Sequence, residues 1–344
     1  MKNNISIVFP EIKSDSGTKT YVQNTLRSLD KVNLLYKYVP VKKIELSLLG
    51  KPYFGVLFQY LFSAIKSDNS KVVHALSNDV VIRGTNLVTI HDIIPYTNPD
   101  IYMNSTYDKI AYRLSYDRSL KVENILLSTQ VGKKSFLKCM DIDQDRIKVI
   151  NIPINHSYFY PGGINPYPDN GKVHVLMVSD FNPRKRIDII IKELAGNPEI
   201  EFYHIGPTQG WMARSNELVG YSKKFENIKF LGQKNIQEVR EYMAAADLFL
   251  YLSDNEGYGL PPIEAMACGT NVVVNDIPVF KEILGDKAKY VELSKFSSQD
   301  LIKAIAEKRD KDTLVNFTQK YSLESYGKKL NELYSYIMAV FYKM

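Results

Sequence analysis

Short apolar runs of four to six residues recur along the whole chain, each bounded by turn residues and separated from the next by a helical pattern. This alternation is typical of βαβ units and parallel sheets. Between two series of runs lie residues 160–171, whose three prolines and three glycines predict a linker. The runs lie at 5–9, 71–76, 86–90, 124–128 and 147–150, and then at 173–178, 201–205, 228–231, 247–252 and 271–274.

The pattern therefore predicts an α/β protein with two Rossmann-like, doubly wound domains that face each other across a cleft. We expect the first domain over 1–160, the linker over 160–171 and the second domain over 172–322. An apolar stripe at helical spacing continues beyond residue 322, and we expect this helix, at about 323–344, to pack back on the first domain. Asn235 and Glu238 have the spacing of a capping box for a further helix.

Composition narrows the class of protein. The chain has 344 residues, and its 45% apolar and 24% charged content excludes wholesale disorder. Two cysteines cannot build a disulfide scaffold or a four-thiolate zinc site, and the five histidines form no close metal-ligand pair. No apolar stretch reaches the ~20 residues of a membrane span. These features predict a cytoplasmic protein.

The net charge of +6 is unevenly placed. Residues 1–170 carry 21 Lys and Arg against 15 Asp and Glu, whereas the remaining residues carry 23 of each. The excess is too small and diffuse to favour a nucleic-acid partner. The apolar segment 53–65 is flanked by Lys42, Lys43, Lys51 and Lys66 and is a candidate for peripheral contact with an anionic membrane. The alternative, a buried helix covering the first sheet, stays open.

Residues 251–282 contain the most informative chemistry. A strand ends near 252, a loop with Gly257 and Gly259 follows, and a helix is predicted over 263–267. The start of such a helix, beside approachable backbone N–H groups, can hold a phosphate. Glu256 lies in the loop and Glu264 in the helix, and two carboxylates beside a phosphate site suit the hydroxyls of a ribose and a hexose. The alternative is that both are solvated surface acids.

The string E-G-Y-G-L-P-P-I-E-A-M-A-C-G-T from position 256 closely resembles the E-x7-E signature of retaining glycosyltransferases of the GT-B fold, glycosyltransferase family 4. The resemblance is strong over 172–292, moderate over 86–98 and weak over 30–85. It departs from the family pattern in two places. Ser179 and Asp180 stand where the family often has Gly-Arg, and Ile152 and Pro153 replace its Asn-Gly at the hinge.

The resemblance implies roles for individual residues. Segments 178–188, 15–26, 90–96 and 230–234 resemble the diphosphate clamp, the Gly loop, the His-Asp segment and the nucleobase wall. Arg184 is a candidate replacement for the missing family arginine. The implied catalytic residues are Glu256, His91 and Lys185, and the implied substrate-binding residues are Gly17, Arg184, Gly232, Gly257, Tyr258, Gly259, Leu260 and Glu264.

The family's activity implies that a hexose passes with retention from a nucleotide-diphosphate sugar, of the GDP-mannose or UDP-glucose type, to a glycan or lipid-linked acceptor. Cationic and backbone N–H groups would stabilise the leaving diphosphate, so no metal or other cofactor is expected. Closure of the two domains would exclude water. The alternatives are a nucleotide-sugar-binding protein without transferase activity, an NDP-sugar epimerase, a sugar phosphorylase or a Rossmann oxidoreductase. The missing G-x-G-x-x-G argues against the last.

Overall fold

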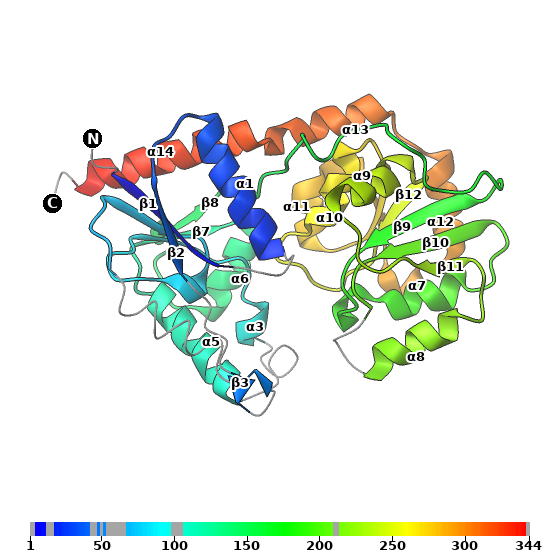
Figure 1. Cartoon of the computed structure of the whole chain (residues 1–344), viewed down its shortest axis with the longest axis horizontal. Helices are drawn as coiled ribbons and strands as arrows, with labels where there is room; N and C mark the ends of the chain where they lie inside the picture. Colours follow the sequence, from blue (N-terminus) through cyan, green and yellow to red (C-terminus); the bar gives the residue numbers. More distant parts are fainter. Residues whose placement is uncertain are drawn as a thin grey trace. The chain divides into compact units, whose positions relative to one another are not determined.

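A computed structural model describes residues 4–11, 17–41, 47–48, 51–52, 67–97, 106–208 and 213–341. The chain forms two compact units. The first comprises Met1–Pro153 together with Leu323–Met344, and the second comprises Ile154–Ser322. Each unit is built on its own six-stranded sheet with helices between the strands, drawn in Figure 1. The prediction of an α/β protein with two doubly wound, Rossmann-like domains is confirmed.

The first unit contains a parallel sheet in the order β2-β1-β5-β6-β7-β8. The central strands are fully buried because both faces of a parallel sheet are covered. The strands are β1 (Ile5–Pro10), β2 (Lys37–Val41), β5 (Val72–Ala75), β6 (Leu87–Thr89), β7 (Asn124–Leu127) and β8 (Ile147–Val149), with a separate pair β3 (Ser47–Leu48) and β4 (Lys51–Pro52). The described helices are α1 (Gly17–Lys31), α3 (Ile94–Thr97), α5 (Thr106–Ser119), α6 (Gln130–Cys139) and α14 (Leu323–Phe341).

The second unit repeats this plan with the order β11-β10-β9-β12-β13-β14, again all parallel. Asn235 and Glu238 form the predicted capping box at the start of α9. The strands are β9 (Val173–Val178), β10 (Ile200–Ile205), β11 (Ile228–Phe230), β12 (Leu248–Tyr251), β13 (Val272–Asn275) and β14 (Lys289–Val291). The helices are α7 (Ile187–Leu194), α8 (Ala213–Ser222), α9 (Ile236–Ala245), α10 (Leu260–Ala267), α11 (Pro278–Leu284), α12 (Ser298–Ala306) and α13 (Lys311–Thr318).

The C-terminal helix α14 lies against α1 in the first unit, as Figure 1 shows. Two of its buried tyrosines enter hydrogen bonds with the sheet and α1. The Tyr326 hydroxyl lies 2.8 Å from that of Tyr21, and the Tyr334 hydroxyl lies 2.7 Å from His74 Nδ1. Unpaired buried polar groups are costly, so these bonds favour one position of α14, which apolar packing alone would not fix.

Gly327 allows α14 and α1 to approach each other closely. A Cβ at this position would lie 2.2 Å from the Ser28 carbonyl oxygen. We therefore expect Gly327→Ala to push the helices apart and lower the free energy of unfolding by about 2 kcal/mol. The matched control is Gly220→Ala in α8, where nothing lies within 4 Å of the added Cβ. That variant gains helix propensity and should be slightly more stable. Thermal unfolding measures both, and an unchanged melting temperature for Gly327→Ala would contradict the close packing.

The segment expected to be a linker, 160–171, lies within the second unit. The chain passes between the units earlier, at Pro153 and Ile154, and again at Ser322 and Leu323. Tyr167 is buried and its ring stacks on His174 at 4.7 Å between centroids. Arg240 donates to the Gly162 carbonyl at 2.5 Å. The physical reason is that proline and glycine indicate turns, and turns also occur in segments that pack on a domain.

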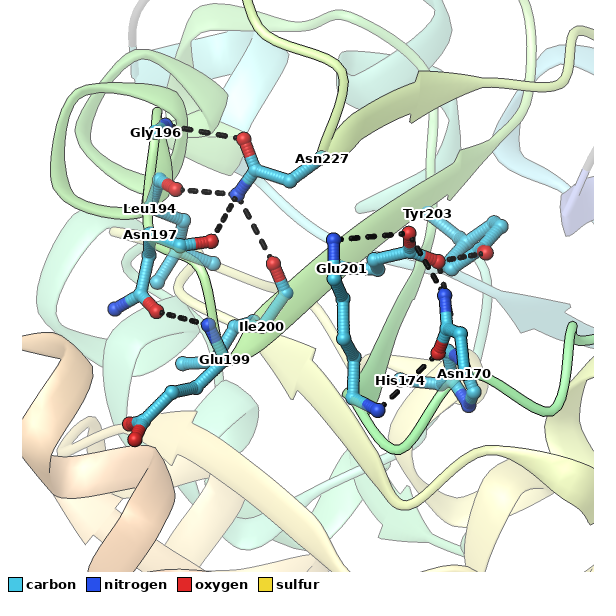
Figure 2. A network of polar contacts seen from close by, with 11 residues as sticks. Asn170, His174, Leu194, Gly196, Asn197, Glu199, Ile200, Glu201, Tyr203 and Asn227 are labelled. Carbon is cyan, nitrogen blue, oxygen red and sulfur yellow. Dashed lines mark hydrogen bonds and ion pairs between the residues drawn. The ribbon is translucent and has the colours of Figure 1, made fainter.

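Two polar networks, shown in Figure 2, hold the amino ends of strands in the second sheet. These ends lie opposite the carboxyl ends that form the candidate site. The Asn227 amide donates to the carbonyls of Leu194, Asn197 and Ile200. Glu201 accepts from the Tyr203 hydroxyl at 2.5 Å. Figure 2 shows Asn170 and His174 gathered around the same carboxylate. These contacts fix the start of β10 and make the sheet rigid, so the carboxyl end of the strand has a fixed position.

Candidate active site

The predicted site residues of the second unit gather at the carboxyl ends of β9 and β12. These strands are neighbours, yet the chain leaves β9 toward β10 and β11 on one side and returns to β12 for β13 and β14 on the other. Such a reversal of strand order is where open parallel sheets bind ligands. The loop after β9 contributes Arg184 and Lys185, and the loop after β12 contributes Glu256. The fold thus brings together two segments about 70 residues apart in the chain.

Glu256 lies between two cations. One carboxylate oxygen is 2.5 Å from Lys185 Nζ and the other is 2.6 Å from an Arg184 guanidinium nitrogen. The side chains of Lys185 and Glu256 are each only 6% exposed, whereas that of Arg184 is 24% exposed. Arg184 supplies the second positive charge in a chain that has Ser179 and Asp180 in place of the family's Gly-Arg. With two cations and one carboxylate, the cluster carries a net positive charge of one.

The two loops are tied to each other through their backbones. The Arg184 carbonyl accepts from the Asp254 N–H at 2.8 Å and from the Ser253 hydroxyl at 3.2 Å. The Asn182 side chain caps the 3₁₀ turn Pro183–Lys185 by accepting from the Arg184 N–H. These bonds hold the two cationic side chains where β9 and β12 end. A site built this way is preorganised by main-chain contacts.

Burial and charge set the protonation of the cluster. Burial alone would raise the pKa of the Glu256 carboxyl, but Lys185 and Arg184 outweigh it and hold that pKa below its ordinary value. Burial lowers the pKa of the Lys185 ammonium, against the opposing charge of Glu256. Glu256 is therefore ionised at neutral pH and can accept hydrogen bonds from sugar hydroxyls.

The loop between β12 and α10 presents backbone N–H groups. Gly259 has φ +86°, and a Cβ there would lie 2.6 Å from the Phe280 ring, so only glycine fits. Within the described part of the chain, no acceptor is recorded for the N–H groups of Gly257, Gly259 and Leu260. Tyr258 between them is buried. Such amides at a helix start can bind an anion.

Helix α10 begins at Leu260, three residues before the predicted start at 263. Its first turn includes Pro261 and Pro262, whose missing N–H groups cost nothing there because first-turn donors have no intrahelical partner. The two prolines were expected at the helix start, which is confirmed, but the predicted first helical residue was three positions too late. The earlier start makes the Leu260 N–H part of the helix N-terminus.

Glu264 lies one turn into α10 and is half-buried. Burial raises the pKa of its carboxyl to about 8. Among the residues that the structure describes, no hydrogen bond or ion pair to this carboxyl is recorded. A half-buried carboxyl without a protein partner remains available to a ligand that donates hydrogen bonds, such as a vicinal diol.

The strand ends on the other side of β9 carry an aromatic wall. The rings of Phe181 and Phe230 meet edge to face at 5.3 Å between centroids, and His204 packs against both. Gly232 has φ +69°, and its carbonyl accepts from the Gly206 N–H at 2.9 Å. A Cβ at Gly206 would lie 1.9 Å from the Ser179 carbonyl oxygen. Sequence reasoning missed Gly206, although a glycine directly after a buried strand is a usable signal.

Known proteins resemble this chain in sequence and in fold. Residues 166–321 match the family model of glycosyl transferases group 1, which spans almost the whole second unit. The chain is similar to the O-antigen chain mannosyltransferase RfbU of Salmonella typhimurium, with 29% identity over 76% of this chain and 72% of that protein. It is also similar to the D-inositol 3-phosphate glycosyltransferase of Mycolicibacterium smegmatis, with 26% identity over 46% of this chain and 39% of that protein.

The chain is a glycosyltransferase. Solved structures support the fold. Sucrose-phosphate synthase from Thermosynechococcus elongatus superposes with a TM-score of 0.78 and 17% identity, covering 97% of this chain and 99% of that one. At this identity the likeness shows the fold alone, and it is that of the two Rossmann-like domains described above.

The glycosyltransferase carries the remaining predicted site residues in its first unit. His91 follows β6, and its Nε2 lies 3.0 Å from the Leu76 carbonyl oxygen. Its ring packs edge to face on Tyr21 at 4.6 Å between centroids. Burial lowers the pKa of His91 to about 4, so the imidazole is neutral at physiological pH. Gly17 is the exposed first residue of α1, and the preceding residues 12–16 lie outside the described chain.

Several expectations for the glycosyltransferase stay predictions. The membrane candidate 53–65 lies outside the described residues. Throughout the described ranges, no helix has the length and apolar character to cross a membrane. Over the same ranges, no group of three or more His, Cys, Asp and Glu is placed to hold a metal ion. The Pro153 carbonyl, at the altered hinge, accepts from the Asn24 amide at 3.2 Å.

Proposed function

We propose that the chain is a retaining hexosyltransferase of glycosyltransferase family 4. It moves a hexose from a nucleotide-diphosphate sugar to a glycan or lipid-linked acceptor. The observation that carries the proposal is the Glu256 carboxylate held between Lys185 and Arg184, beside the N–H groups of the loop after β12. A carboxylate that can accept hydrogen bonds from sugar hydroxyls, next to groups that can bind an anion, matches what a nucleotide sugar requires.

Each group has a defined task in this proposal. Glu256 accepts hydrogen bonds from the hexose and orients it, and Glu264 accepts from the ribose hydroxyls. Lys185, Arg184 and the N–H groups of Gly257 to Leu260 bind the diphosphate. As the bond to the sugar breaks, the diphosphate gains negative charge, and these preformed positive groups stabilise it without reorganisation. A phosphate oxygen of the leaving diphosphate takes the proton of the acceptor hydroxyl. That hydroxyl attacks the anomeric carbon on the face that the diphosphate leaves, which retains the anomeric configuration.

The cationic side chains take the place of a metal ion in the proposed reaction. We therefore expect transfer to proceed equally well with excess EDTA. The measurement is the rate of hexose transfer or of slow donor hydrolysis before and after chelation. A loss of rate that magnesium or manganese restores would contradict this part of the proposal.

The relatives' names favour a mannosyl donor, since RfbU is named a mannosyltransferase. The test is a panel of nucleotide sugars that includes GDP-mannose and UDP-glucose, scored by thermal stabilisation and donor hydrolysis. A donor present at 100 times its Kd should stabilise the chain by about 2.7 kcal/mol. NMR of the released sugar reports whether the anomeric configuration is retained. If no nucleotide sugar stabilises the protein or is turned over, the proposal is wrong.

A further inference from the structure

Tyr251 contacts Lys185 through its hydroxyl. Its hydroxyl lies 2.5 Å from Lys185 Nζ, and the same ammonium lies 4.8 Å from the centre of the tyrosine ring. Both residues are almost completely buried, at 2% and 5% exposure. The two distances together place the ammonium beyond the hydroxyl, so the contact that holds it is a hydrogen bond to a charged group, shielded from water.

Tyr251 is itself held rigidly. It is the last residue of β12, and its ring lies nearly parallel to that of Phe249, with 6.1 Å between centroids. The edge of Phe280 packs against it at 6.0 Å. Phe280 also closes the space beside Gly259. The tyrosine therefore connects the strand, the cation and the N–H-bearing loop through direct packing.

Lys185 needs an anchor besides Glu256. An ammonium has three N–H donors, and in the described chain two of them are accounted for, by Tyr251 and Glu256. In the proposed function, Glu256 turns its lone pairs to hexose hydroxyls when the donor binds, which weakens its hold on the ammonium. The tyrosine contact requires no such change, because its oxygen faces only the buried cluster.

We propose that Tyr251 is a positioning residue: its hydroxyl holds the Lys185 ammonium at the place where the leaving diphosphate gains charge. This inference rests on the proposed function. In this account Tyr251 touches neither the sugar nor the phosphate and acts through Lys185, and its hydroxyl also lies within hydrogen-bonding reach of the Glu256 carboxylate. The third N–H of the ammonium then points to a ligand oxygen.

The variant that tests this is Tyr251→Phe, which keeps the ring and removes one oxygen. Because a hydrogen bond to a charged group is lost, we expect the transfer rate kcat to fall about 10-fold to 100-fold. The affinity for GDP and UDP, measured by calorimetry, should fall less, since neither nucleotide carries a hexose and Glu256 still holds the ammonium. The control is Tyr321→Phe, which removes the hydroxyl of an equally buried tyrosine that donates to the Ile283 carbonyl. It should lose stability but keep kcat.

A double-mutant cycle separates positioning from a structural role. In a Lys185→Met background, Tyr251→Phe should change the residual rate less than about 2-fold, because the group it positions is gone. All rates are taken at a temperature where thermal unfolding shows every variant folded. If Tyr251→Phe has its full effect in the Lys185→Met background, or if the single variant is as fast as wild type, the inference about Tyr251 is wrong. The proposed function is not affected by either result. A wild-type chain that binds neither nucleotide and transfers nothing overturns the proposed function and, with it, this inference.

Discussion

Glu256→Gln is expected to reduce hexose transfer by about 100- to 1,000-fold, the loss seen when one preorganised polar group is removed from an active site. The amide keeps the size of the side chain but loses the negative charge that orders Lys185 and Arg184. The measurement is kcat with the donor identified by the nucleotide-sugar panel. A rate within 2-fold of wild type would remove Glu256 from the site.

The same substitution also tests the ion-pair cluster. Removing one partner of a buried pair leaves an uncompensated charge, so we expect a loss of about 2 kcal/mol without ligand. The pKa of Glu256 is lowered from its ordinary value of 4.5, so its charge stabilises the fold above that pH and the contribution is lost as pH falls below it. The stability difference between variant and wild type should therefore shrink in acid.

Asp254→Asn is the matched control for Glu256→Gln. Asp254 lies two residues away in the same loop and pairs with Arg186, but its side chain is 44% exposed. An exposed ion pair contributes little, so both the rate and the melting temperature should stay close to wild type. If this control lost activity as Glu256→Gln does, the general charge of the loop would be responsible instead of the Glu256 contact.

Glu264→Gln is expected to stabilise the folded chain while weakening nucleotide binding. Burial raises the pKa of Glu264 to about 8, from 4.5 in the unfolded chain. The wild-type fold thus loses stability as pH rises from 4.5 to 8, because the unfolded chain releases its proton first. The amide has no proton to lose. The variant should gain about 2 kcal/mol over wild type at pH 8.5, a figure reduced from the full pKa shift because the carboxyl is partly hydrated.

Two measurements check this prediction. Melting temperatures of both proteins from pH 5 to pH 9 should diverge up to about pH 8 and then run parallel. Calorimetry at pH 9, where the Glu264 carboxyl is ionised, should show about 10-fold weaker binding of GDP or UDP, because a neutral amide accepts more weakly from ribose hydroxyls than a carboxylate does. Glu226→Gln, at an exposed position of the same unit, should change neither quantity. Melting curves that never diverge would show that the Glu264 carboxyl is solvated.

Much of the fold follows from local patterns. The run 173–178 coincides with β9 because five apolar residues and one histidine between turns suit a buried parallel strand. Strand β2 was missed because it contains Pro40 and is largely exposed at the edge of its sheet. The predicted linker failed for a related reason, since the sequence shows turns but not whether Tyr167 finds a buried partner.

Part of the candidate site could likewise be predicted from the sequence, and part could not. The order of residues around Glu256 and Glu264 is a local signal, and it was sufficient to predict a loop with carboxylates next to a helix start. No local pattern links Lys185 to Tyr251 or Glu256, because they are 66 and 71 positions apart. In the sequence, Tyr251 cannot be told apart from the apolar residues of its strand.

The sequence by itself determined the class of fold, the two series of strands and the types of residue available for sugar and phosphate chemistry. Periodicity and turn residues act over a few positions, so they are visible without a structure. Only the tertiary structure decided which charges meet. Parallel strands β9 and β12 end side by side, and that alone places a buried carboxylate between two cations and a tyrosine hydroxyl against one of them.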